Sequence, residues 1–105
     1  MRVAVDLQAS YGAVGISARY PARVFEISAS GLRLRTSEPL QPGLINIAFD
    51  LDGRNRHTRI ELRVIARVVR ILREEPPSFE YALRLVDDEF VGKMRQAVLM
   101  VSLGL

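Results

Sequence analysis

The 105-residue sequence has no cysteine, no tryptophan, one histidine (His57) and one lysine (Lys93). Without cysteine there is no disulfide and no thiolate metal site, and a single histidine is too few for a histidine-rich zinc site. The same absences argue against cysteine nucleophiles and against histidine-assisted serine nucleophiles. We therefore expect no metal site and no cofactor, and we expect a binding domain rather than an enzyme.

Long apolar runs are also missing. No stretch reaches eighteen apolar residues, and the first residues do not read as a basic segment followed by an apolar one. We therefore expect no membrane insertion and no secretion, and take the cytoplasm as the compartment. The length suits one core, so residues 1–105 are expected to form a single domain, and a hydrophobic fraction of 49% is enough to build it.

Motifs of catalysis are absent or have simpler explanations. Neither a GxGxxG nor a GxxxxGK(S/T) phosphate loop occurs. Asp50 and Asp52 flank an expected hairpin, and the acids at 87–89 precede an expected helix, so turn chemistry and the helix dipole explain both groups. His57 lies in a polar run, where we interpret it as a solvated loop residue.

The charge balance is basic, with a net charge of +3 carried almost entirely by arginine. Arginine suits phosphate oxygens and guanine edges, which favours an anionic ligand, although codon bias in a GC-rich genome also explains the composition. A general nucleic-acid surface would need exposed aromatic side chains among the arginines. Most of the seven aromatics fall on expected core positions, so nucleic-acid binding is the less favoured interpretation.

Apolar and polar residues alternate with period two along most of the chain, which predicts half-buried strands. A shift across 65–69, where Val68 and Val69 are adjacent, indicates either a bulge or a strand that is covered on both faces. Turns are expected at 11–17, 28–31, 39–43, 50–55 and 74–78. The expected strands are residues 3–9, about 18–27, 32–35, 45–49, 58–64 with its continuation through the shift, and 79–85.

The period changes to helical spacing after Asp87, a plausible N-cap. Apolar residues recur there from Phe90 to Val101, and we expect this helix to pack on its own barrel. The sequence therefore predicts a mainly β fold, namely a small six-stranded antiparallel β-barrel closed by a C-terminal α-helix.

The strand–turn–strand corner at 22–34 carries the most informative polar residues. The Glu26 carboxylate can accept hydrogen bonds from a guanine N1–H and exocyclic amine, and the Ser28 hydroxyl can reach a phosphate or a base edge. We expect Gly31 to occupy a positive-φ turn position and to let a ligand approach the backbone.

At this corner the chain resembles the PilZ domain, a bacterial receptor for cyclic di-GMP (cyclic dimeric GMP). The family motif is Asp/Asn-x-Ser-x-x-Gly on a small β-barrel, preceded by an RxxxR segment. Glu26-x-Ser28-x-x-Gly31 is similar to the first motif, with glutamate replacing aspartate or asparagine. The resemblance continues through 2–7, 31–36, 40–43, 66–69 and 81–85, and so covers essentially the whole chain.

The second motif is incomplete. In this register Arg2 corresponds to the second arginine of RxxxR, and the first would precede Met1. Another RxxxR, at Arg19 and Arg23, lies one strand too late, and we interpret it as a coincidence of an arginine-rich chain. The resemblance thus implies Arg2, Glu26, Ser28 and Gly31 as ligand-binding residues. Arg33 and Arg70 are possible additions, since Arg70 falls where some family members carry an aromatic that stacks on guanine.

Two functions follow from the resemblance. The first is a sensor that binds cyclic di-GMP without catalysis and relays its level to a protein partner. The second is a degenerate barrel that binds no nucleotide and serves as a protein-interaction adaptor. A longer acid and a missing arginine can each cost about 1–3 kcal/mol of binding free energy, which leaves both functions open.

Overall fold

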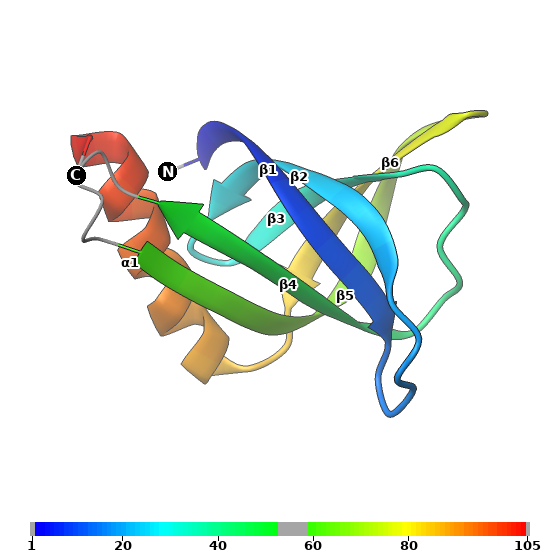
Figure 1. The fold of residues 1–105 in the computed structure, drawn as a ribbon, viewed down its shortest axis with the longest axis horizontal. Helices are drawn as coiled ribbons and strands as arrows, with labels where there is room; N and C mark the ends of the chain where they lie inside the picture. The colour runs from blue at the N-terminus through cyan, green and yellow to red at the C-terminus, as the bar shows by residue number, and fades with distance from the viewer. Residues whose placement is uncertain (1, 53–58, 105) are drawn as a thin grey trace.

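The chain folds into a closed antiparallel β-barrel of six strands followed by one helix. The computed structural model describes residues 2–52 and 59–104. Around the barrel the strands follow the order β1-β2-β3-β6-β5-β4, and the helix covers one end (Figure 1). The elements are β1 (Arg2–Ala13), β2 (Tyr20–Ser28), β3 (Gly31–Thr36), β4 (Leu44–Asp52), β5 (Arg59–Glu75), β6 (Ser78–Leu85) and α1 (Asp88–Leu103).

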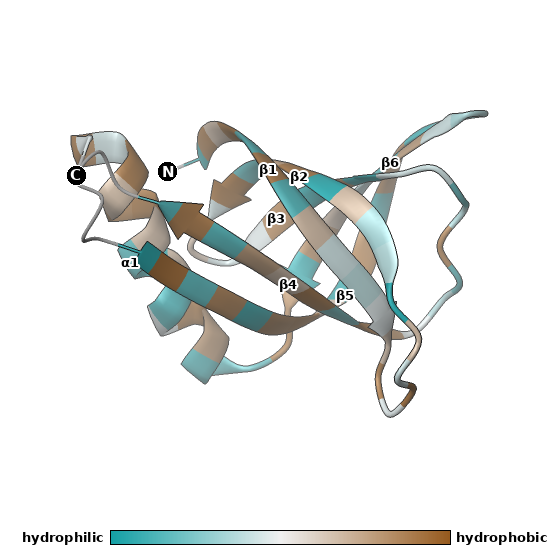
Figure 2. Ribbon diagram, in the orientation of Figure 1, coloured by the Kyte–Doolittle hydropathy of each residue, from teal (hydrophilic) through white to brown (hydrophobic). Residues whose placement is uncertain are grey.

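The predicted period-two alternation places one face of each strand inside the barrel. Apolar and polar residues alternate visibly along β4 and β5 (Figure 2), because successive side chains of a strand point to opposite faces. The interior is filled by branched aliphatic side chains and by four of the seven aromatics. Its largest fully buried members are Tyr81, Ile27, Leu34, Ile47, Leu62, Met94, Val24 and Val64.

The alternation of β2 reverses at Phe25. The period-two alternation expected over 18–27 would place Val24 and Glu26 on one face, but the pairing with β3 skips Phe25, so that Val24 pairs with Leu34 and Glu26 with Arg33. This bulge keeps both Val24 and Ile27 in the core and turns Glu26 to the outer surface. Phe25 is half-buried on the outside of the barrel.

Of the two alternatives left open for the shift in β5, the structure shows a bulge. The pairing with β6 skips Val69 and then Leu72, so that this strand bends as it passes β6.

Several expected strand boundaries were wrong. Strand β1 continues to Ala13 and β2 begins at Tyr20, because the hairpin pairs directly from Tyr11 to Tyr20. Only Pro76 and Pro77 separate β5 from β6.

The hairpin loop expected at 50–55 begins later than predicted, because β4 remains paired with β5 as far as Asp52. The remainder of that loop, together with His57 and Thr58, lies outside the described residues.

Helix α1 begins at its predicted cap, Asp87, and ends at Gly104. The Asp87 carboxylate accepts a hydrogen bond from the Glu89 amide at 3.0 Å, and Gly104 ends the helix in the left-handed region with φ 66°. Met94, Ala97 and Val98 are buried against the barrel, as expected. Among residues 2–52 and 59–104, no helix has the length and apolar content needed to cross a membrane.

Candidate ligand-binding site

The polar corner between β2 and β3 opens into a pocket of about 220 Å³, called here the corner pocket. It lies where the start of β1, the β2–β3 turn, the bulged part of β5 and the end of β6 come together. All six residues expected to bind a ligand line this one pocket. Its full lining is Arg2, Glu26, Ile27, Ser28, Ser30, Gly31, Leu32, Arg33, Val69, Arg70, Ala82, Leu83 and Arg84.

Strand register explains why these residues meet. Ser28 pairs with Arg2 on one side, while Glu26 pairs with Arg33 on the other. The two bulges supply the rest of the arrangement, because one turns Glu26 outward from β2 and the other lies next to Arg70 in β5. The pocket therefore depends on the bulges in β2 and β5. With regular alternation along β2, the Glu26 side chain would point into the barrel.

Glu26 lies between two arginines. Its Oε1 atom is 3.7 Å from Arg2 Nε and 3.6 Å from Arg33 Nε, and its side chain is 24% exposed. These separations exceed hydrogen-bonding distance. The two arginines therefore balance the charge of the carboxylate without forming hydrogen bonds that would fix its orientation. Arg2 is 69% exposed, which leaves its guanidinium free to turn toward a ligand.

The pocket carries a surplus of positive charge. Four arginines and one glutamate line it, which gives a formal charge of +3. Guanidinium groups make bidentate hydrogen bonds to phosphate, and a concave surface of one sign concentrates ions of the opposite sign. The arrangement suits a ligand with more than one negative charge and a hydrogen-bonding edge for Glu26.

Two hydrogen bonds hold the β2–β3 turn at the pocket. The Ser28 hydroxyl donates to the Gly31 carbonyl oxygen at 3.3 Å, and the Leu85 amide donates to the Ser30 carbonyl oxygen at 2.9 Å. Ser28 therefore stabilises the turn in addition to any contact that it makes with a ligand.

The reason for glycine at position 31 differs from our expectation. Gly31 does not have a positive φ. A Cβ added to it would lie 2.1 Å from the Leu83 carbonyl oxygen, a separation that real Cβ atoms do not tolerate. The requirement is close packing of β3 against β6 and not turn geometry.

Arg84, Val69 and Ser30 line the pocket but were not among the expected residues. Arg84 pairs with Gly31 across β3 and β6, so only the register of these two distant strands brings it to the site. No signal in the linear motif pointed to it. The second RxxxR lies elsewhere, since the Arg19 side chain bonds Ser10 and the Arg23 side chain bonds Asp6.

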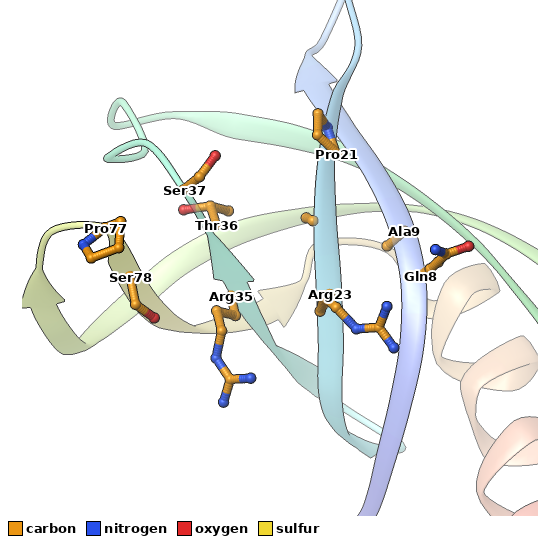
Figure 3. Close-up of a pocket in the computed structure, with 10 residues that line it drawn as sticks. Gln8, Ala9, Pro21, Arg23, Arg35, Thr36, Ser37, Pro77 and Ser78 are labelled. Atoms are coloured by element: carbon orange, nitrogen blue, oxygen red, sulfur yellow. The ribbon is translucent and has the colours of Figure 1, made fainter.

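A second depression, of about 660 Å³, is less suited to an anion. It lies between β1 and the tip of the β5–β6 hairpin and contains Arg23 and Arg35 (Figure 3). Both guanidinium groups are already occupied, Arg23 by Asp6 at 2.6 Å and Arg35 by Glu80 at 2.9 Å. We call this surface the hairpin groove and assign it no ligand.

Comparison with known proteins identifies the fold family. A family model described as "PilZ domain" matches residues 1–98. The chain belongs to the PilZ domain family. PilZ domains are ligand-binding receptor domains and not enzymes, and the family generally binds cyclic di-GMP. A search of curated proteins gave no match.

Solved structures share the fold of this PilZ domain at low sequence identity. The PilZ domain of CeSA from a cellulose-synthesising bacterium is 17% identical with a TM-score of 0.64, over 98% of this chain and 97% of that chain. The inhibitor of motility MotI/DgrA of Bacillus subtilis is 14% identical with a TM-score of 0.72, over 97% of this chain and 49% of that chain. PlzA of Borreliella burgdorferi, solved in complex with cyclic di-GMP, is 13% identical with a TM-score of 0.56, over 98% and 51% respectively.

Proposed function

We propose that this PilZ domain is a receptor for cyclic di-GMP and that the corner pocket is the binding site. The observation that carries the proposal is the convergence of Arg2, Glu26 and Arg33 from three strands on one positively charged pocket. Each group matches one part of the ligand, because the arginines suit its phosphates and the glutamate suits a guanine edge.

Binding exchanges one set of contacts for another. In the ligand-free domain the Glu26 carboxylate balances Arg2 and Arg33. A guanine N1–H and exocyclic amine replace the arginines at Glu26, and both guanidinium groups then turn to the phosphates. Partly exposed ion pairs of this length contribute only about 0–1 kcal/mol, so the exchange costs little.

The turn and the bulged strand complete the proposed site. Gly31 keeps β3 close to β6 and so brings its pairing partner Arg84 to the pocket, while Ser28 holds the turn and presents its hydroxyl. Arg70 and Arg84 lie on the β5 and β6 side of the pocket and offer two further donors to the ligand. A planar guanidinium at position 70 can also stack on a base.

The signal is relayed by binding alone. A ligand held across β1, β2, β3, β5 and β6 cross-links strands that are distant in sequence, and it stabilises the folded domain by mass action. At a hundredfold excess over its Kd the gain is about 2.7 kcal/mol. We propose that a protein partner recognises this ligand-bound form.

Calorimetric titration with cyclic di-GMP tests the receptor function. The matched set is the wild-type domain, the double variant Glu26→Ala/Ser28→Ala, and Arg63→Ala, which removes an exposed arginine of β5 outside the corner pocket. We expect saturable heat for the wild type and for Arg63→Ala, and none for the double variant. Absence of heat with the wild type at millimolar ligand would leave the nucleotide-independent adaptor as the function.

A further inference from the structure

A third cavity, of about 370 Å³, lies at the end of the barrel away from the helix, and we call it the distal pocket. It is formed by the end of β1, the start of β2, the β3–β4 loop and the start of β4 (Figure 1). It shares no lining residue with the corner pocket. Its volume falls in the range of pockets that enclose a small molecule or a large side chain.

Aromatic and aliphatic groups form its walls. Tyr11 and Tyr20 are direct cross-strand partners whose ring centroids are 5.6 Å apart with an interplanar angle of 40°. Pro39 and Pro42 of the β3–β4 loop and Leu44 of β4 add apolar surface. Tilted aromatic rings of this kind attract cations to their faces and also pack against alkyl chains.

Glu38 is the one charged residue among those that line the distal pocket. Its carboxylate makes no ion pair with any arginine or lysine in residues 2–52 and 59–104, whereas Asp6, Glu26 and Glu80 all do. Glu38 lines the same pocket as Tyr11, and its negative charge, after burial, raises the pKa of the Tyr11 hydroxyl. The pocket is thus locally acidic in a basic chain.

The loop that carries Glu38 is fastened to the barrel. The Thr36 hydroxyl donates to the Glu38 carbonyl oxygen at 2.6 Å, and the Leu40 amide donates to the Tyr81 hydroxyl at 3.1 Å. Thr36 and Tyr81 are both buried, so the core holds both anchors in place. The distal pocket is formed before any occupant arrives, which lowers the entropic cost of binding.

The rim of this end is apolar and exposed. Val14 and Ile16, on the β1–β2 hairpin, are 42% and 60% exposed, and Tyr20 is 53% exposed. Brown segments mark this hairpin tip in Figure 2. Exposed apolar groups gathered around an acidic, aromatic pocket are typical of a surface that receives a protein segment.

We infer that the distal pocket receives an arginine or lysine side chain of a partner protein, flanked there by apolar residues. The alkyl stem packs between the two tyrosines and the prolines, and the cationic end pairs with Glu38. The flanking residues cover Val14 and Ile16. This inference does not rest on nucleotide binding, since it concerns the ligand-free domain and residues at the opposite end of the barrel.

Nuclear magnetic resonance titration of the isotopically labelled, nucleotide-free domain tests the inference. The probe is a capped peptide of sequence leucine-arginine-leucine, and its control replaces arginine by citrulline, a neutral group of the same shape. We expect saturable shifts confined to amides near 11–14, 20 and 38–45 with the arginine peptide. The citrulline peptide is expected to bind at least about fivefold more weakly, equivalent to about 1 kcal/mol.

Variants locate the contact. Glu38→Gln and Tyr20→Ala alter exposed side chains and are each expected to weaken peptide binding about fivefold or more. Glu74→Gln, which removes one exposed carboxylate of β5, and the double variant Glu26→Ala/Ser28→Ala are expected to bind the peptide as the wild type does. Failure of cyclic di-GMP binding in calorimetry therefore leaves this result unaffected.

Several outcomes would overturn the inference. Equal binding of the citrulline peptide or unchanged binding by Glu38→Gln would show that the charge pair is not used. Chemical shift changes centred on the corner pocket would place the contact elsewhere. No shift change up to about 10 mM peptide would exclude binding, because a binding free energy near −3 kcal/mol would already be detected there. Shifts of the same amides that depend on protein concentration without peptide would assign the surface to a second copy of the chain instead.

Discussion

The backbone of Gly31 in β3 lies against the carbonyl oxygen of Leu83 in β6, so closely that a Cβ at position 31 would be 2.1 Å from that oxygen. This contact sets the distance between the two strands at the corner pocket. It also keeps Arg84, the pairing partner of Gly31, at the pocket wall.

Replacement of Gly31 tests this packing. Gly31→Ala forces β3 away from β6, and overpacking of this kind typically costs about 1–3 kcal/mol, with more expected here because the opposing atom is backbone. Gly92→Ala is the matched control, because a Cβ on this exposed helical glycine meets nothing within 4 Å. The control is expected to raise the free energy of unfolding by about 0.5–1 kcal/mol. Urea unfolding measures both, and an equally stable Gly31→Ala would refute the packing argument.

The helix is expected to contribute to barrel stability through Met94, which is fully buried. Met94→Ala should lower the free energy of unfolding by about 2–5 kcal/mol, because it leaves a cavity between α1 and the barrel. Leu99→Ala, on the same helix but 49% exposed, should change it by no more than about 0.5 kcal/mol. Similar losses for the two variants would mean that α1 does not pack as described.

A role for Arg84 in ligand binding is predicted by the structure but not by the sequence motif. Because Arg84 lines the corner pocket, Arg84→Gln is expected to weaken cyclic di-GMP binding by about 1–2 kcal/mol and to reduce the salt dependence of the Kd. Arg63→Gln removes the same charge outside the pocket and should alter the Kd much less. Calorimetry at low and high ionic strength measures both effects, and equal losses for the two variants would show that only net charge matters.

Tyr11 gives the domain a pH-dependent stability in the alkaline range. Burial, and secondarily Glu38, raise its pKa above the usual 10.0. The unfolded state therefore loses this proton first, so the stabilisation is complete below pH 10 and is lost as pH rises through the folded-state pKa. Tyr11→Phe should flatten the fall of the unfolding free energy above pH 10, measured by urea unfolding across that range. An unchanged pH slope in the variant would exclude Tyr11 as the cause.

The fold was largely predictable because its signals are local. Period-two alternation, the adjacent valines of β5 and the Asp87 cap each depend on neighbouring residues, and the structure confirms them. The bulge at Phe25 was not predictable in this way. Its neighbours continue a regular alternation, and the reversal arises because the core needs both Val24 and Ile27.

The candidate site was predictable only as far as the motif reaches. Glu26, Ser28 and Gly31 are neighbours in sequence, and the family resemblance supplied Arg2, Arg33 and Arg70. Arg84 could be found only from the pairing of β3 with β6, which joins residues 53 positions apart and is not visible in any linear pattern. The steric demand at Gly31 was missed for the same reason, since its cause lies in β6.

The most direct test of the central claim is a titration of the labelled domain with cyclic di-GMP, followed by amide chemical shifts. We predict saturable shifts concentrated in 26–33, 69–70 and 82–84, the backbone around the corner pocket, with little change near Tyr20 and Leu44 at the distal pocket. Saturable shifts centred elsewhere, in the hairpin groove for example, would contradict the assigned site. A spectrum unchanged at millimolar ligand would contradict the receptor function itself.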